Sequence, residues 1–436
     1  MPNRGKPAPP EALALTRTRW GPRSAWSAGA LLFLLDTVQA VLLTPWLLGW
    51  IGASELSFWL ALSSALGLVS VALAAFSPPL VRHIAQSQAV AGTTPAAPSN
   101  WLPLRRHALR FGGVVLALLV LAFVPLLADA LRERPERWLA VLLYVAALAL
   151  RLRASASFVL LNGCGQVGRD KWLLAAASGL TLVLLVLAAA LLRSVTAMAA
   201  AALLGSLALW AMAWRAERLV ARLSGPQAAA PPDPTEMRRL LLLGVAGFVQ
   251  AGTTVPLATV WLPADEAVSF GFWFRAAAVT GVLAGYYAQV RFPAWARGDA
   301  SAPRELAWVQ ALIAGVAALV ALAIAVSSQV PAMAGLSMLL PATIAALCVA
   351  AALTASSQLL GVYLLARGRS GFVAPAAAIA LAAPLLACGL AAWLTPAAFV
   401  FGYLLCAIAL RGLLQAHWLR LRNEAAARVQ PAQSRP

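Results

Sequence analysis

Long apolar segments dominate this sequence and restrict the folds that are open to it. About twelve of them recur, each near the ~20 residues that a helix needs to cross the core of a bilayer. In hydrocarbon only helices and closed barrels satisfy the backbone, and these runs lack the two-residue alternation of barrel strands. The expected spans are 25–50, 56–76, 111–131, 138–161, 172–192, 195–214, 239–262, 269–292, 305–328, 340–366, 372–394 and 397–418. The sequence therefore predicts an all-α membrane protein of about twelve transmembrane helices.

Arginine and lysine residues are concentrated on alternate connections between these segments. Seven connections, the two tails included, carry 25 of the 33 cations, whereas the intervening connections carry only Arg132, Arg134, Arg137 and Arg193. Such a bias is typical of cytoplasmic loops, so both termini are predicted to be cytoplasmic. The net charge of +18 follows from this orientation, and nucleic acid is not expected as a partner. The apolar segments and the distribution of cations predict a multi-pass protein of an inner membrane, and the ratio of 31 Arg to 2 Lys resembles GC-rich bacterial coding.

The stretch 215–238 lies at the midpoint, with six predicted helices on either side. At an offset of 211, Val38-Gln39-Ala40 matches Val249-Gln250-Ala251, and Pro45, Trp50 and Glu55 match Pro256, Trp261 and Glu266. Because six is even, both halves have the same orientation, as in parallel repeats. The predicted organisation is a cytoplasmic tail 1–24, a lobe 25–214, a cytoplasmic linker 215–238, a second lobe 239–418 and a cytoplasmic tail 419–436. The largest connection is 77–110, and its centre "AQSQAVAGTTPAAPSN", residues 85–100, is expected to be a flexible loop; residues 421–436 are expected to be disordered.

Arginines inside apolar segments are the first candidates for a binding site, because an intramembrane charge is costly and tends to be functional. Arg151 and Arg153 lie near the middle of the fourth segment. Two residues span about 200° of a helix, so both cannot face one cavity. Arg151, which shares a stripe with Tyr144, is the better candidate for the cavity, and Arg153 pairs elsewhere or reaches another wet surface.

Further candidates lie on the first, seventh and eighth segments. Arg275 is followed on its helix face by Tyr286 and Gln289, with snorkelling to the periplasmic side as the alternative. Asp36 is the only acid deep in an apolar segment, with Gln39 beside it. It either exchanges H⁺ or binds Na⁺, or it is the fixed partner of an intramembrane Arg.

Cysteine and histidine residues give no sign of a metal site or of a cofactor. The four cysteines and three histidines have no metal-ligand spacing. Gly163, Gly165 and Gly168 fit G-x-G-x-x-G, but they join two membrane helices rather than a strand and a helix, which argues against a nucleotide. Neither a metal nor a cofactor is expected.

The run "LLTPWLLGWIGASELSFWLALSSALGLVSVALAAFSPPLVRHIA", residues 42–85, resembles the first hairpin of polysaccharide (O-antigen type) flippases. These belong to the multidrug/oligosaccharidyl-lipid/polysaccharide superfamily. The residues that carry the resemblance are Pro45, Gly52, Glu55 and Trp59. "PADEAVSFGFWFRA" and Pro293 are similar to the seventh–eighth hairpin of the same family.

The resemblance implies two six-helix lobes around a central cavity with alternating openings. The substrate would be an undecaprenyl-pyrophosphate-linked oligosaccharide, held by Arg151, Arg153 and Arg275, with Tyr144, Tyr286, Gln289, Gln39 and Gln250 as further candidate contacts. Membrane lipids, and a polysaccharide polymerase or ligase, are the other candidate partners. The chain departs from the family in having few cavity cations and Gly247 opposite Asp36.

Three functions remain open. A flippase for surface polysaccharide biosynthesis, which is not an enzyme, agrees best with these features. A multidrug or cation antiporter of the same fold is the first alternative. An integral-membrane glycan polymerase or glycosyltransferase is the other, but the outer acids here lie in short turns.

Overall fold

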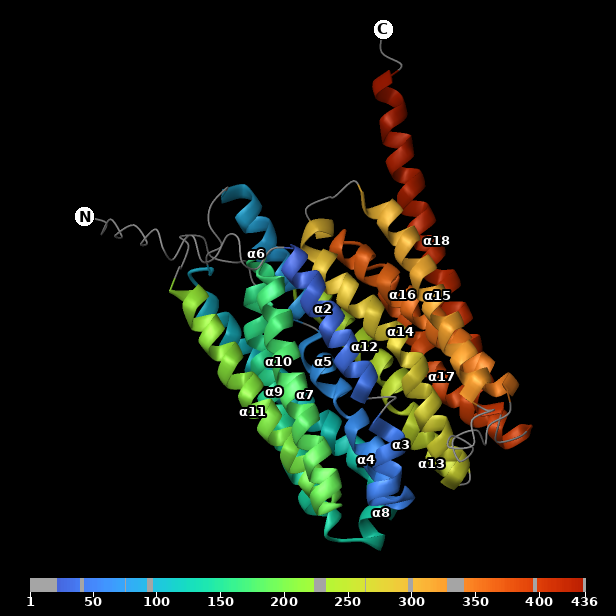
Figure 1. The fold of residues 1–436 in the computed structure, drawn as a ribbon. Coiled ribbons are helices and arrows are strands. Elements are labelled where there is room, and N and C mark those ends of the chain that lie inside the picture. The colour runs from blue at the N-terminus through green and yellow to red at the C-terminus, as the bar shows by residue number, and fades with distance from the viewer. Residues whose placement is uncertain are drawn as a thin grey trace.

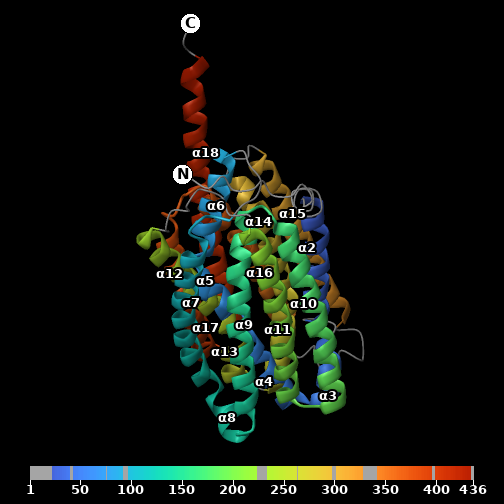
Figure 2. The same ribbon diagram turned by 90° about the vertical axis from the view of Figure 1, so that its left-hand side faces the viewer.

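The chain folds into a bundle of long helices (Figures 1 and 2). The computed structural model describes residues 22–39, 43–74, 76–91, 97–222, 233–262, 264–296, 301–327, 341–394 and 398–433. The helices of the first half are α2 (Pro22–Thr37), α3 (Leu43–Ile51), α4 (Ala53–Ser64), α5 (Gly67–Ala74), α6 (Ser77–Ala91), α7 (Trp101–Phe123), the short turn η2 (Val124–Leu127), α8 (Ala128–Glu133), α9 (Arg137–Gly163), α10 (Val167–Leu187), the π-helical turn η3 (Ala188–Leu192) and α11 (Val195–Ala221). Those of the second half are α12 (Pro234–Gly252), α13 (Thr254–Trp261), α14 (Ala264–Ala296), α15 (Ala302–Ser327), α16 (Pro341–Ala366), α17 (Val373–Trp393) and α18 (Phe399–Gln433).

Ten helices in the described part of the chain are long and apolar enough to cross a membrane. They correspond to all predicted segments except the first and the eighth. The first is divided into α2 and α3, and the eighth, α14, carries the polar residues Arg275, Tyr286 and Gln289. The chain is therefore a multi-pass, all-helical membrane protein, as predicted.

Two helix starts recur at matching positions in the two halves. Helix α3 begins at Leu43 and α13 at Thr254, while α4 begins at Ala53 and α14 at Ala264, so both pairs keep the offset of 211. The turn after α9 also parallels the turn after α16. Gly165 and Gly368 adopt φ of 74° and 72°, where glycine lacks the steric penalty of other residues. In each turn the next amide donates back to the helix, Gln166 to Leu161 O at 2.8 Å and Arg369 to Leu364 O at 2.9 Å.

The halves lie on opposite sides of the bundle, with α2, α5, α12 and α14 between them (Figure 1). We call "basic end" the end where α2, α7 and α12 begin and where α9 passes into α10. The other end carries α8 and the turn at Gly52 between α3 and α4. At the basic end, Arg82 on α6 crosses between the halves and contacts Glu236 on α12 at 2.8 Å.

Two expectations for the connecting segments differ from the structure. The expected loop 85–100 begins inside α6, which continues to Ala91, and residues 92–96 lie outside the described part. Helix α6 forms because Pro78 and Pro79 stand in its first turn, where proline is tolerated, and Leu80, Val81 and Ile84 bury one face. The C-terminal tail is also helical, since α18 continues to Gln433 through a sequence rich in Ala, Arg and Leu, which favour helix.

The predicted linker 215–238 is partly helical. Helix α11 continues to Ala221 and α12 begins at Pro234, where the Asp233 side chain accepts a hydrogen bond from the Thr235 amide at 3.0 Å. Residues 223–232 of this linker, and the N-terminal tail up to residue 21, lie outside the described residues.

Candidate functional site

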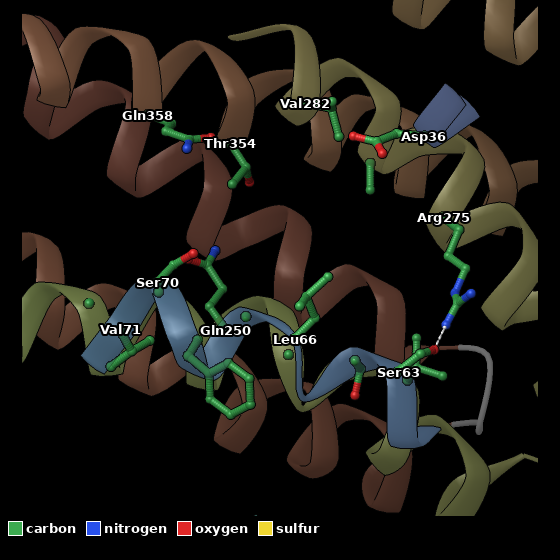
Figure 3. Close-up of a pocket in the computed structure, with 18 of the residues that line it drawn as sticks. Asp36, Ser63, Leu66, Ser70, Val71, Gln250, Arg275, Val282, Thr354 and Gln358 are labelled. Carbon is green, nitrogen blue, oxygen red and sulfur yellow. Dashed lines mark hydrogen bonds between the residues drawn. The ribbon is translucent and has the colours of Figure 1, made fainter. Parts of the chain in front are cut away.

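A cavity of about 850 Å³ lies between the two halves (Figure 3). Helices of both halves line it, among them α2, α4, α5 and α9 from the first and α12, α14 and α16 from the second. Most of its wall is apolar, and its charged lining residues are Asp36, Arg151 and Arg275. The site therefore has two guanidinium groups and one carboxylate in largely apolar surroundings, which is a typical composition for a ligand pocket.

Breaks in the first and seventh membrane segments place a glutamine at equivalent points of the wall. Gln39 follows the end of α2, and Gln250 lies in the last turn of α12; both line the cavity. After Gln250, the hydroxyl groups of Thr253 and Thr254 donate back to the carbonyl oxygens of Val249 and Gln250. Carbonyl oxygens near the end of α12 therefore have hydrogen-bond donors from the same segment. The side-chain amide of Gln250 faces the cavity.

Arg151 enters the cavity from the middle of α9 and is positioned by α11. Its Nε donates to Ser206 Oγ at 3.0 Å, and that hydroxyl donates onward to Ala202 O at 2.7 Å. Two turns earlier on α9, Tyr144 lines the same cavity and donates to Ser63 O at 3.3 Å. Because only Nε of Arg151 is engaged by these contacts, its two terminal nitrogens can bind an anion.

Arg275 enters from α14 in the second half and contacts α4 in the first. Its Nη2 donates to Leu60 O at 2.9 Å and to Ser63 Oγ at 2.5 Å, the contact drawn as a dashed line in Figure 3. This arginine joins the two halves across the wall of the cavity. Snorkelling away from the bundle, the alternative expected for Arg275, is not the arrangement observed.

Asp36 lines the cavity and accepts a hydrogen bond from the Tyr286 hydroxyl at 2.5 Å. Tyr286 lies on α14 and does not line the cavity, so its role is to hold the carboxylate from the second half. Among the described residues, Asp36 has no cationic group within 4.0 Å. Its direct partner is therefore a tyrosine and not the arginine that one of the alternatives required.

Lys171, one of the 25 cations counted on the connections between segments, is buried. Its side chain is 1% exposed and lies in the first turn of α10. Its Nζ donates to Gln289 Oε1, lies 5.3 Å from the Tyr286 ring centroid and is 3.6 Å from Asp170 Oδ2. The signal that could have revealed it is the pair Asp170-Lys171, since a lysine is buried only when it is paired.

Six of the nine predicted site residues line the cavity: Asp36, Gln39, Tyr144, Arg151, Gln250 and Arg275. Tyr286 and Gln289 act outside it, through Asp36 and Lys171. Arg153 is exposed on the outer face of α9, as the angle of about 200° between residues two apart on a helix requires. The described residues contain no group of three or more His, Cys, Asp or Glu side chains that could hold a metal.

Polar residues of α16 also line the cavity and were not predicted. Thr354, Ser357 and Gln358 face it at spacings of three and four residues, which places them on one side of a helix. The spacing in the sequence T-A-S-S-Q inside an apolar segment could have indicated this stripe.

Comparison with known proteins identifies the fold. No protein-family model matches the chain, and no curated protein matches it. Among solved structures, MATE in the straight conformation is 14% identical, with a TM-score of 0.61 over 95% of this chain and 99% of that one. A point mutant of the Vibrio cholerae MATE transporter VcmN is 16% identical, with a TM-score of 0.58 over 92% of this chain and 98% of that one. A MATE in complex with MaD3S gives 14% identity and a TM-score of 0.59 over 95% and 99%. The chain thus has the two-lobed, all-helical fold of the MATE transporters.

Proposed function

We propose that this protein moves an undecaprenyl-pyrophosphate-linked oligosaccharide across the bacterial inner membrane, for surface polysaccharide biosynthesis, by alternating access. The observation that carries the proposal is the pair Arg151 and Arg275, which face one largely apolar cavity from opposite halves. A pyrophosphate is anionic and offers oxygens to which guanidinium groups bind through two parallel hydrogen bonds. In this apolar cavity such contacts are stronger than in water.

Arg275 provides a link between substrate binding and movement of the halves. Its contacts to Leu60 O and Ser63 Oγ hold α14 of the second half against α4 of the first. A phosphate oxygen that competes for this guanidinium would release the contact. Arg151 is held within the first half by Ser206, so it would retain the substrate while the halves separate.

The proposed orientation places the basic end, and with it both termini, in the cytoplasm. No ATP hydrolysis is proposed, and Asp36 is the candidate for coupling to H⁺ or Na⁺. Membrane lipids surround the bundle, and a polysaccharide polymerase or ligase is a further candidate partner.

A multidrug or cation antiporter is the second candidate, and Asp36 is the observation that favours it. A cavity carboxylate held by Tyr286 could exchange a cationic drug for a proton or sodium ion. This hypothesis predicts that Asp36→Asn abolishes efflux of a cation and that Arg151→Ala does not. The flippase hypothesis predicts dependence on Arg151. A glycan polymerase or glycosyltransferase would instead act on repeat units that have already crossed the membrane.

The first test is a deletion in the native host, assayed for surface polysaccharide and for lipid-linked repeat units. A flippase deletion removes the surface glycan and traps single repeat units inside spheroplasts. Repeat units that reach the periplasm but stay unpolymerised or unligated would contradict the proposal and indicate an assembly enzyme.

Variants expressed in the deletion strain then test the cavity. Arg151→Ala should abolish export at an unchanged protein level, and Arg151→Lys should restore part of it because the charge returns without the bidentate geometry. Arg304→Gln is the matched control, since Arg304 is exposed on α15 and does not line the cavity. Undiminished surface glycan in Arg151→Ala would refute the assignment of the site.

A further inference from the structure

Three helices of the first half converge on one buried carboxylate near the basic end. Glu217 on α11 is 4% exposed. Its Oε1 accepts from Trp101 Nε1 at 2.8 Å and lies 3.0 Å from Arg105 Nε, both on α7. Its Oε2 accepts from Ser157 Oγ on α9 at 2.6 Å. Both oxygens are therefore occupied, and Glu217 neutralises Arg105 alone.

Several arginines in the part of these three helices nearer the basic end have no such counter-charge among the described residues. Arg106 and Arg110 on α7, and Arg153 on α9, are exposed, and none has a described carboxylate within 4.0 Å. Arg218 on α11 is exposed as well, and its guanidinium lies 3.6 Å from the centroid of the Trp214 ring. The opposite end differs, because Glu55 there pairs with both Arg134 and Arg137, at 2.7 and 2.8 Å.

Two of these cations, Arg110 and Arg153, lie at a similar depth on one outer face. Figure 2 shows α9 between α7 and α11 on the side that faces the viewer. A Cβ on Gly112 of α7 would lie 3.4 Å from Leu152 of α9, which sets these two positions at the same level. Arg110 lies two residues from Gly112 and Arg153 one residue from Leu152, both toward the basic end, so the two arginines are at a similar level. Arg153 is about 15 Å along the axis from the end of α9 at Gly163.

The same face is apolar farther from the basic end. Its exposed side chains there are Val114, Leu118, Leu121, Leu139, Leu142, Leu204 and Leu207. Such a surface is suited to acyl chains, with the arginines where the chains meet the headgroups. Arg153 in particular stands inside the span of α9, where an exposed cation without a counter-ion is expensive.

We propose that the arginines of α7, α9 and α11 bind the phosphate headgroup of an anionic phospholipid in the leaflet at the basic end. Arg110 and Arg153 would contact the phosphate, with the Arg218–Trp214 stack beside it, and the acyl chains would follow the apolar part of the face. Charge complementarity favours this occupant, because exposed cations, Arg106, Arg110, Arg153 and Arg218 among them, face the membrane here, and the buried acid Glu217 is already paired with Arg105. Glu217 is a positioning residue that holds the three helices in register.

Native mass spectrometry of the full-length protein in detergent tests this site with two defined lipids, phosphatidylglycerol and phosphatidylethanolamine. The wild type should retain phosphatidylglycerol in preference. Arg153→Gln and Arg110→Gln should each weaken it by about fivefold, as expected for loss of one cation near an anionic headgroup. Arg153→Lys should keep most of the binding, and Arg304→Gln, an exposed cation on α15, should bind as the wild type does.

The outcomes separate this site from the cavity. The proposal would be overturned if the wild type and the double variant Arg110→Gln/Arg153→Gln bound phosphatidylglycerol equally. It would also be overturned if the double variant lost phosphatidylethanolamine to the same extent as phosphatidylglycerol. A third probe, undecaprenyl pyrophosphate, identifies the source of the phosphate. If it displaces phosphatidylglycerol at equimolar concentration, the face belongs to the transported lipid and the proposal fails. Arg151→Gln should leave phosphatidylglycerol binding unchanged, so failure of the transport proposal leaves this one standing.

Discussion

At the scale of single residues, Glu217 shows how a buried charge organises a membrane protein. The carboxylate is almost fully buried and has three donors, from Trp101, Arg105 and Ser157. Burying an ion is unfavourable unless its hydrogen bonds are satisfied, and here both oxygens are. The cluster fixes the position of α11 relative to α7 and α9, because the three donors come from these two helices.

Removal of this charge should destabilise the protein. Glu217→Gln leaves Arg105, 18% exposed, without its counter-ion, so the free energy of unfolding should fall by about 3 kcal/mol. Thermal unfolding of the purified protein in detergent measures the change. The control Glu136→Gln, at an exposed acid, should melt close to the wild type. A melting temperature of Glu217→Gln equal to that of the wild type would show that the cluster does not support the fold.

At the scale of helices, close approach depends on a few small residues. A Cβ on Gly402 of α18 would meet the backbone of α17, with Ala387 Cα only 2.5 Å away. The two helices therefore pack backbone to backbone, as small residues allow in membranes. Gly389, two residues farther along α17, has open space around it.

These two glycines form a matched pair for mutation. Gly402→Ala should force α17 and α18 apart and destabilise the protein by about 1–3 kcal/mol, the usual cost of overpacking. Gly389→Ala should be neutral or slightly stabilising, because alanine favours helix over glycine. Unfolding temperatures in one detergent compare them, and equal values for both variants would contradict the close contact.

Helices were predictable from the sequence to the extent that they are apolar. The length of each apolar segment indicated that a helix is present there. The bounds of α9 differ from the predicted ones by one or two residues at either end. Hydropathy missed α6 and the end of α18, because helices that leave the membrane lose the apolar signal while their packing or helix propensity persists. The start of a new helix at α13 was also missed, since hydropathy does not register the single residue Thr253 between α12 and α13.

Site residues were predictable where the position of a residue around its own helix determines whether its side chain lines the cavity. The angle between Arg151 and Arg153 separated the cavity residue from the outer one. The partners Ser206, Ser63 and Tyr286 come from other helices, and no local pattern gives their pairing. Lys171 was not among the predicted site residues for the same reason, because its contact with Gln289 depends on α14.

At the scale of the whole molecule, α14 touches the first half along its length. Arg275 contacts α4, Tyr286 contacts Asp36 on α2, and Gln289 contacts Lys171 on α10. At the basic end the ion pair of Arg82 with Glu236 adds a contact from α6 to α12. The halves are thus held together at several levels by individually weak polar contacts.

Reversal of that ion pair should open the basic end. Arg82→Glu and Glu236→Arg each create a like-charge contact, and the double variant restores attraction. A cysteine at Thr354 in the cavity, in a background without Cys164, Cys348, Cys388 and Cys406, reports opening through its rate of maleimide labelling.

Each single reversal should raise the labelling rate about fivefold, for a pair worth about 1 kcal/mol, and the double variant should return it to the starting value. An unchanged rate in all three variants would mean that the pair does not restrain the halves.

The recurring helix starts have a consequence for the origin of the chain. A six-helix precursor that starts and ends on one side of a membrane can be duplicated without turning the second copy over, so two identical subunits could have paired before their genes fused. Such a homodimer presents every charge twice. Fusion allowed the copies to diverge: Asp36 corresponds to Gly247 at the offset of 211, and Arg275 to Ser64. At the offset of the turns Gly165 and Gly368, Arg151 corresponds to Thr354. The two halves thereby place different charged and polar groups on the wall of one largely apolar cavity.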